Sequence, residues 1–366
     1  NEWLMQVREF RQLISEVEDF PLQYFYDVRE SIVRIRIENA HLEENELFDL
    51  RRSLSTIESI VNILNHSDED DSHAEENDGW RREKKYTYPA LHRLAKDVIT
   101  FPQIIQRIDQ ILDKYGKIRD NATPELLQIR RELAKTEGSI SRTLYSILRS
   151  AQSEGVVEKD VTPTLRDGRL VIPVIPTLKK KIKGIVHDES ATGKTVFIEP
   201  TEVVEANNRV RELEGEERKE IIRILTSFTN KVRPYVREMM DSYRFLAKID
   251  LIQAKAKIAE IFKAIEPEVE DHPHIDWIRA IHPLLQISLE KKGEKVVPLD
   301  IILTQEKRIL IISGPNAGGK SVCLKTVGLL QYMLQCGLSI PVSERSKTGV
   351  FQNIMIDIGD EQSLEN

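Results

Sequence analysis

Apolar residues recur at three- and four-residue steps over much of the chain. In the first 64 residues they include Val7, Phe10 and Leu13, and the same spacing returns between Leu47 and Val61. This period is typical of a helix that turns one face towards a core. The pattern therefore predicts a set of core-facing helices in the N-terminal region.

Two longer stripes predict extended helices further along the chain. Thr123 and Pro124 supply an N-cap and a first-turn proline for a stripe over residues 126–147. A second stripe covers residues 203–249, and a helix of that length would span roughly 70 Å. Pro234 lies inside the second stripe, so we expect a local kink there.

The period changes between the two stripes. Residues 168–200, GRLVIPVIPTLKKKIKGIVHDESATGKTVFIEP, contain β-branched runs broken by glycine and proline, which indicate short strands and turns. A second change occurs near Asp276. After it, KRILIISGP at 307–315 predicts a buried strand of the parallel type, and KSVCLKTVGLLQYMLQCG at 320–337 predicts a helix.

These elements predict a mainly α fold with a small β-rich insertion and a C-terminal α/β part. A chain of 366 residues is too long for one compact core. We expect a helical region at 1–117, long helices with an insertion at about 160–200 in 118–275, and the α/β part at 276–366. The segment SDEDDSHAEENDG at 67–79 has seven acidic residues and no lysine or arginine, which predicts a solvated loop.

Composition narrows the function classes. The chain is 40% hydrophobic, 31% charged and 6% aromatic, with a formal net charge of -7. This balance favours solvated helices and excludes a globally basic nucleic-acid binder, although a local basic patch could still bind phosphates. Cys323 and Cys336 lie too far apart in one predicted helix to form a disulfide. We expect a reducing, cytoplasmic setting and no membrane contact.

The clearest motif is GPNAGGKS, which fits G-x-x-x-x-G-K-[ST] at every fixed position. Glycines let backbone N–H groups wrap phosphates, and the following helix directs its positive end at them. Lys320 should reach the β and γ oxygens of a nucleotide, and the Ser321 hydroxyl should bind Mg²⁺. The predicted nucleotide-binding residues are Gly314, Pro315, Asn316, Ala317, Gly318, Gly319, Lys320 and Ser321.

Two other segments are weaker candidates. ATGKT at 191–195 contains Gly-Lys-Thr, but Asp188 stands where the first glycine belongs and a strand follows, so we interpret it as a turn. NIMID at 353–357 is similar to a hydrophobic strand ending in an Mg²⁺-binding acid, which makes Asp357 a candidate ligand. The usual hydrophobic run followed by Asp-Glu is absent after the loop. We therefore assign no catalytic residue.

A lysine cluster within TLKKKIKG at 177–184 is the clearest basic patch. Such a patch is either a solvated face or a contact for the phosphate backbone of a nucleic acid. Its place at the tip of two long helices favours the contact, without strong sequence preference. The predicted nucleic-acid-binding residues are Lys179, Lys180, Lys181 and Lys183, flanked by Arg166, Arg169 and Lys194.

The histidines and nucleophiles predict no further chemistry. His272 and His274 flank Pro273 but lack a set of partners typical of a zinc site. No arrangement of serine, cysteine and histidine along the sequence indicates covalent catalysis.

These motifs resemble the MutS family of ATPases over most of the chain. GPNAGGKS is that family's form of the phosphate loop, and AIHPLL at 280–285 is similar to the stretch before its ATPase sheet. Three longer segments are similar to the second bacterial subfamily, the endonuclease paralogue without the mismatch-recognition domain. They are LRDGRLVIPV at 165–174, GIVHDESATGKTVFIEP with VVEANNRVRELEGEE between 184 and 217, and DIGDEQS at 357–363.

The resemblance implies a mainly α lever of long helices, a β-rich clamp at about 160–200, and the N-terminal part of an ABC-type P-loop ATPase domain at 276–366. It also implies ATP and Mg²⁺ as cofactors and a homodimer with ATP at its shared interface. In the subfamily, such proteins bind branched DNA, restrain homologous recombination and nick DNA through a C-terminal nuclease module. Some split stalled ribosomes, so ribosomal RNA is an alternative partner.

The sequence departs from the family in several places. It lacks the Asp-Glu strand, the signature loop and the nuclease module, and no Met precedes Asn1, so we expect a fragment truncated at both ends with weak or no ATPase activity. DIGDEQS matches a loop of the family, which weakens the case for Asp357 as a metal ligand. FIE at 197–199 mimics the Phe-x-Glu of mismatch readers, but it lies in the clamp segment and predicts no mismatch recognition.

Three hypotheses follow for the function of the chain. It is part of a DNA-acting ATPase, part of the same engine acting on ribosomes, or a nucleic-acid-binding fragment without turnover. Chromosome-organising ATPases with long coiled arms are the nearest alternative fold. In those proteins the phosphate loop precedes the arm, whereas here it follows it.

Overall fold

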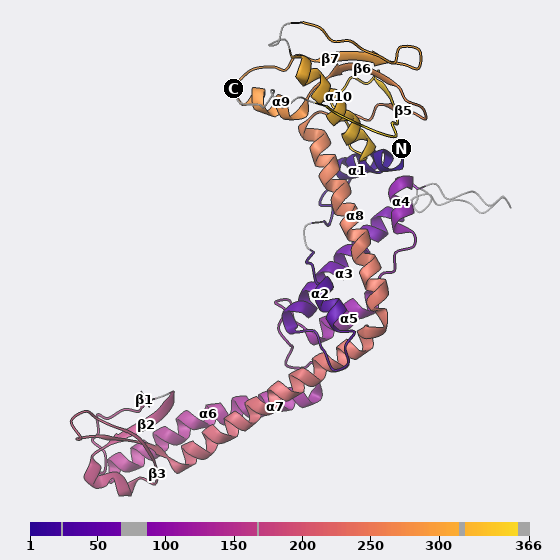
Figure 1. The fold of residues 1–366 in the computed structure, drawn as a ribbon. Coiled ribbons are helices and arrows are strands. Elements are labelled where there is room, and N and C mark those ends of the chain that lie inside the picture. The colour runs from indigo at the N-terminus through magenta and orange to yellow at the C-terminus, as the bar shows by residue number, and fades with distance from the viewer. Residues whose placement is uncertain (23–24, 67–85, 167, 315–318, 358–366) are drawn as a thin grey trace, which may run out of the picture. The chain divides into compact units, whose positions relative to one another are not determined.

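The computed structural model describes residues 1–22, 25–66, 86–166, 168–314 and 319–357. The described part is mainly helical, with two small four-stranded sheets. The chain forms two compact units, one from Asn1–Phe25, Arg52–Phe101 and Arg237–Asn366, and one from Tyr26–Arg51 and Pro102–Val236. Figure 1 shows the elements of each unit. The acidic segment 67–79, predicted to be a solvated loop, lies outside the described residues.

Helices of the first unit pack around one apolar core. They are α1 (Glu2–Glu16), the later part of α3 (Glu44–Leu64), α4 (Pro89–Ala95) and α8 (Val236–Ile261). Val7, Phe10 and Leu13 of α1 are fully buried in this core. The Phe10 and Phe20 rings meet edge to face with centroids 5.3 Å apart. The prediction of core-facing helices in the N-terminal region is therefore confirmed, and the apolar residues of α1 form the face that packs into the core.

The start of α4 depends on a side chain from α1. Glu9 is buried, and its carboxylate accepts hydrogen bonds from the backbone N–H of Ala90 at 2.8 Å and of Leu91 at 2.9 Å. The first N–H groups of a helix have no partner within the helix. Pro89 occupies the first turn of α4, where its missing N–H costs nothing. Glu9 thus fixes where α4 begins.

The C-terminal part of the first unit is a mixed sheet covered by a helix. Its strands are β5 (Glu268–Glu270), β6 (Ile275–Ala280), β7 (Leu299–Leu303) and β8 (Lys347–Gly349), in the order β5-β8-β6-β7. β5 runs parallel to β8, while β6 is antiparallel to both β7 and β8. Two further helices belong here, α9 (Pro283–Glu290) and α10 (Lys320–Gln335). Trp277 of β6 is fully buried against Leu330 and Leu334 of α10.

The buried parallel strand predicted from KRILIISGP is wrong for this structure. Residues 307–314 form no strand, and Ile309 and Ile311 are 85% and 86% exposed. A buried parallel strand needs paired neighbours on both edges and cover on both faces. Among the described residues no strand pairs with this run. The phosphate loop therefore follows an apolar segment, but not one built into the sheet, and a complete P-loop ATPase sheet is not present in the described chain.

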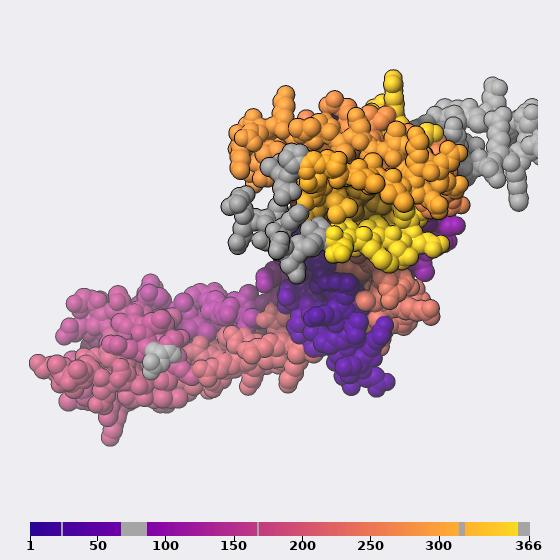
Figure 2. Space-filling model, turned by 45° about the horizontal axis from the view of Figure 1, so that its top comes forward, coloured from indigo at the N-terminus to yellow at the C-terminus, as the bar shows by residue number. Residues whose placement is uncertain are grey.

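The second unit is built on two long helices that lie side by side. They are α6 (Pro124–Ser153) and α7 (Thr201–Val232), accompanied by α2 (Arg29–Arg34) and α5 (Pro102–Ile111). Figure 2 shows α6 and α7 as adjacent rows of surface atoms in magenta and pink. The Thr123 hydroxyl accepts a hydrogen bond from the Leu126 N–H at 3.2 Å, which confirms the predicted N-cap. No helix in the described ranges, including the 32-residue α7, is long and apolar enough to cross a membrane.

The predicted kink at Pro234 is confirmed as a short break in the helix. A 3-10 turn, η2 (Arg233–Tyr235), separates α7 from α8. Proline removes one backbone donor and clashes with the preceding turn of an α-helix, which favours such a break. The Arg233 side chain donates to the carbonyl of Ile35 at 2.6 Å and to that of Ala40 at 3.3 Å, which ties this turn to the segment after α2.

A small antiparallel sheet lies at the far end of α6 and α7, as the change of period predicted. Its strands are β1 (Thr164–Arg166), β2 (Arg169–Val174), β3 (Gly184–Glu189) and β4 (Val196–Pro200), in the order β1-β2-β4-β3. A 3-10 helix, η1 (Pro176–Lys181), connects β2 to β3. We call residues 164–200 the clamp. Its core packs Ile172 and Ile198 against Leu144 and Leu148 of α6.

Candidate nucleotide loop and clamp surface

The described C-terminal end of the phosphate loop is a glycine in the left-handed conformation. Gly319 has φ 78° and ψ 11° and is the residue before α10. This left-handed conformation is easy for glycine and costly for residues with a Cβ. α10 then begins at Lys320, as predicted. The other predicted loop residues, Pro315, Asn316, Ala317 and Gly318, lie outside the described residues.

Lys320 bridges the two ends of the loop. Its Nζ donates a hydrogen bond to the carbonyl oxygen of Gly314 at 2.5 Å. Lys320 and Ser321 are both half-buried in the first turn of α10. Free N–H groups and the positive end of the helix dipole gather at such a turn. An ammonium, a hydroxyl and helix N–H groups are therefore brought together, and these are the donors that hold phosphate.

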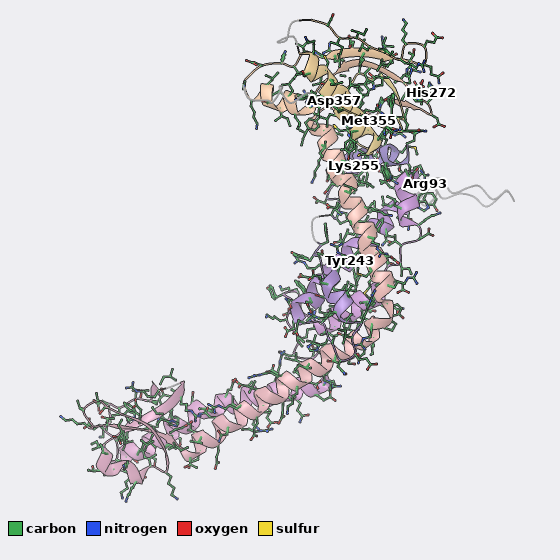
Figure 3. The ribbon with its side chains drawn as sticks, viewed as in Figure 1. Arg93, Tyr243, Lys255, His272, Met355 and Asp357 are labelled. Carbon is green, nitrogen blue, oxygen red and sulfur yellow. The ribbon has the colours of Figure 1, made fainter. Side chains whose placement is uncertain are left out.

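Contacts further along α10 hold the helix in place. The buried Gln331 side chain donates to the Gly349 carbonyl at 2.9 Å, which ties α10 to the end of β8. At the other end, Lys255 of α8 donates to the Cys336 carbonyl at 2.6 Å and lies 5.1 Å above the Trp3 ring (Figure 3). Burial lowers the pKa of Lys255 below its ordinary value. The loop is thus carried by a fixed helix.

Asp357, the candidate Mg²⁺ ligand, is an exposed residue outside any strand. Met355, two residues earlier, is 86% exposed, and both are labelled in Figure 3. The strand half of the strand-and-acid interpretation is therefore wrong. Ile356 does make a close contact, since a Cβ built on Gly328 of α10 would lie 2.3 Å from its Cδ1.

The four lysines of the clamp form an exposed basic surface. Lys179, Lys180 and Lys181 lie on η1, and Lys183 precedes β3; all four are exposed. Ile182, between the lysines, is buried in the clamp core and holds this segment down. The basic surface is thus attached to a folded scaffold. ATGKT forms the turn between β3 and β4, as predicted, and carries the exposed Lys194.

The two arginines that flank the lysines in sequence both make contacts within the clamp, but Arg166 is exposed and Arg169 is half-buried. The Arg166 guanidinium lies 4.4 Å from the centre of the Phe197 ring, where it covers the aromatic face. Arg169 pairs with Glu199 at 2.7 Å. We conclude that the four lysines and the exposed Arg166 make up the basic surface available to a partner, whereas Arg169 is engaged with Glu199.

Glu199 is the centre of a buried polar cluster that the sequence did not predict. Its side chain has no exposure, and it accepts hydrogen bonds from Arg169 Nη1 at 2.7 Å, His187 Nε2 at 2.6 Å and Asn207 Nδ2 at 2.5 Å. Burial alone would raise the pKa of Glu199, but these hydrogen bonds hold it below its ordinary value. The cluster joins β2, β3 and β4 to the second turn of α7.

The Phe197 and Glu199 side chains of the FIE segment lie in the interior of the clamp. Phe197 is 6% exposed and Glu199 is fully buried, so neither side chain reaches a base in this conformation. β3 and β4 come very close at this point. A Cβ on Gly184 would lie 2.1 Å from the Glu199 carbonyl oxygen. Only glycine therefore fits at the start of β3.

Comparison with curated proteins gives similar relatives over nearly the whole chain. One from Levilactobacillus brevis, named Endonuclease MutS2, is 37% identical over 363 residues, which cover 99% of this chain and 43% of the relative. One of the same name from Geobacillus sp. strain WCH70 is 36% identical over 345 residues, 94% of this chain and 41% of the relative. A third, from Pelotomaculum thermopropionicum, is 39% identical over 284 residues, 78% of this chain and 35% of the relative. No protein-family model matches the chain. The chain spans about two fifths of the length of these relatives.

Proposed function

Because the chain belongs to the MutS family and is MutS2-like, we propose that it is part of a dimeric, DNA-binding ATPase. In this proposal, ATP and Mg²⁺ bind at the loop that ends in Gly319, Lys320 and Ser321, and binding is coupled to movement of the lever helices and the clamp. The observation that carries it is the placement of Lys320 at the start of α10, bonded back to the first glycine of the motif.

The proposed roles of the loop residues follow from their chemistry. Lys320 would leave the Gly314 carbonyl and pair with phosphate oxygens, because a charged acceptor binds an ammonium more strongly than a neutral one. The Ser321 hydroxyl would bind Mg²⁺, and the N–H groups of the first turn of α10 would hold the phosphates between them. The chain carries no hydrophobic run followed by Asp-Glu after the loop. We therefore expect this chain alone to bind ATP but to hydrolyse it weakly or not at all.

The clamp is the proposed contact for nucleic acid. Its lysines are compact point charges on flexible stems, suited to phosphate oxygens and not to the reading of bases. The expected partner is DNA, branched or of any sequence. The longer protein is proposed to act as a homodimer and as a DNA endonuclease; the names of its relatives support the endonuclease part of this proposal.

The nucleotide part of the proposal is tested with Lys320→Ala. We expect the parent chain to bind a fluorescent ATP analogue with Mg²⁺ and Lys320→Ala to bind it at least about tenfold more weakly, since a charged hydrogen bond is lost. Lys325→Ala, five residues further along α10, is the matched control and should bind as the parent does. Equal affinities for the parent and Lys320→Ala would overturn the proposed nucleotide site.

The nucleic-acid part needs a separate measurement. A labelled DNA four-way junction is bound to the chain and challenged with unlabelled duplex, junction or ribosomes. Junction as the strongest competitor supports the DNA assignment. Ribosomes as the strongest competitor would instead favour ribosomal RNA as the partner of the clamp lysines. If the chain bound neither the junction, the duplex nor ribosomes, the clamp would be rejected as a nucleic-acid contact.

A further inference from the structure

Three metal-binding side chains meet beside the mixed sheet of the first unit. They belong to Glu270, His272 and His274, and one ligand atom from each lies within 4.8 Å of the other two. Glu270 Oε2 is 3.2 Å from His272 Nε2, and the two imidazole centroids are 5.8 Å apart. Figure 3 labels His272 at the β5 side of the sheet. The three residues alternate along the chain, but alternation alone does not explain why they gather.

The strand order explains the gathering. β5 and β6 pair with opposite edges of β8, so the residues between them must cross the end of β8. Gly349, the last residue of β8, donates its N–H to the His274 carbonyl at 2.6 Å. A Cβ on Gly349 would lie 1.8 Å from the His272 carbonyl oxygen, so the crossing chain rests directly on this glycine. Pro273 fixes one backbone angle between the two histidines.

From this geometry we propose that Glu270, His272 and His274 bind a divalent transition metal, with Zn²⁺ as the best match. Two imidazoles and one carboxylate are a ligand set that suits zinc. Ligand bonds of about 2.0 to 2.2 Å at tetrahedral angles place donor atoms about 3.4 Å apart. The Glu270 and His272 atoms already have nearly that separation. The His274 ligand atom lies within 4.8 Å of the other two, so it must move closer to complete the site.

Three protein ligands leave one coordination position for water or for a group from a partner. The bound metal would also fasten the crossing segment over β8, because its ligands lie at both ends of that segment. Lys347 of β8 is a competitor, since its Nζ lies 3.8 Å from Glu270 Oε1 and 2.9 Å from Glu268 Oε2. On metal binding, Lys347 keeps Glu268 and gives up its longer contact with Glu270.

The alternative is an ordinary surface ion pair between His272 and Glu270. The chain contains a matched example of such a pair, in which His41 Nε2 lies 3.3 Å from Glu43 Oε1. Within the described residues, no third metal-binding side chain joins His41 and Glu43 in a group of this kind. Substitution of His41 therefore shows how much zinc binding depends on a histidine–carboxylate pair alone, in contrast to a site with three ligands.

The test is a zinc titration of the tag-free chain after treatment with a chelator, against a chromophoric competitor. We expect one Zn²⁺ per chain with a dissociation constant in the micromolar range or below. Glu270→Gln, His272→Gln and His274→Gln should each weaken binding at least about tenfold, because each removes one of three ligands. Asp271→Asn, in the same segment, and His41→Gln should bind zinc as the parent does.

A second readout excludes unfolding as the cause of lost binding. In the presence of chelator, the three ligand variants should melt within a few degrees of the parent chain. Added Zn²⁺ should raise the melting temperature of the parent and of the two controls but not of the ligand variants, since binding to the folded state alone stabilises it. Zinc affinity that is unchanged in the ligand variants, or lost equally in His41→Gln, would overturn the proposal.

Discussion

Arg169 Nη1 lies 2.7 Å from Glu199 Oε2, and the Glu199 side chain is fully buried. A buried carboxylate is tolerated because it is paired and hydrogen-bonded, and it becomes costly when a partner is lost. Within the clamp, Glu199 therefore connects three strands and a helix through its hydrogen bonds. Its role is structural, and the first two predictions follow from it.

Substitution of Glu199 should loosen the clamp. Glu199→Gln keeps the shape of the side chain but removes the charge that Arg169 and His187 face, and we expect a loss of about 3 kcal/mol in clamp stability. The measurement is hydrogen exchange of the β4 amides, together with urea unfolding. Glu189→Gln, on exposed β3, is the control and should change stability by less than about 0.5 kcal/mol. Equal effects of the two substitutions would contradict the role assigned to Glu199.

Clamp stability should also fall in acid through this residue. Since the folded pKa of Glu199 is below its ordinary value, the unfolded chain binds more protons than the folded chain between the two pKa values. The contribution of Glu199 is therefore fully present above the unfolded pKa of about 4.3 and is lost as pH falls through the folded pKa. Exchange rates of the β4 amides, measured between about pH 6 and pH 3 and corrected for intrinsic exchange, follow this loss. Glu199→Gln should show less of it, and an identical pH profile would reject the prediction.

The pair of long helices should depend on apolar contacts more than on its ion pairs. Leu144 of α6 is fully buried, so Leu144→Ala should cost about 3 kcal/mol. Arg209 of α7 contacts Glu132 at 2.8 Å but is 40% exposed, so Arg209→Gln should cost less than about 1 kcal/mol. That smaller cost should shrink further in high salt. Urea unfolding of both variants at low and high salt tests this order, and a larger loss for Arg209→Gln would reverse it.

The clamp lysines should control the salt dependence of DNA binding. If Lys181 contacts a phosphate, Lys181→Gln should weaken binding to all sequences alike and reduce the slope of log affinity against log salt by about 0.9. Fluorescence anisotropy with duplexes of different sequence provides the measurement. Lys135→Gln, an exposed lysine on α6, is the matched control. A slope that changes as much in the control as in Lys181→Gln would remove the clamp from the contact surface.

Elements marked by local signals could be predicted from the sequence. Thr123 and Pro124 define the start of α6, and Pro234 defines the break between α7 and α8, because capping and proline geometry act within a few residues. The change from helical spacing to β-branched runs broken by glycine and proline located the clamp strands. Gly319 before the α10 helix also follows from the motif itself. All of these signals lie within one or two turns of the element they specify.

Features that depend on distant partners could not be predicted. The run at 309–312 is apolar and mostly β-branched, but whether it becomes a buried strand depends on neighbours that an apolar pattern does not reveal. Glu199 gathers partners from positions 169, 187 and 207, and only the folded clamp brings these together. The sequence showed His272 and His274 without a set of partners for a zinc site, and Glu270 was not singled out. Their approach depends on how the chain crosses Gly349.

The exposed segment at 309–312 has a practical consequence for the chain in solution. Its four apolar side chains are at least 44% exposed, and no strand among the described residues pairs with them. An unpaired, apolar, β-branched run is a template on which other copies of the chain can add strands. Self-association through this run would increase with protein concentration and would proceed without unfolding of either unit. The storage lifetime of the purified chain would then be set by this segment, and a lysine in place of Ile311 would extend it.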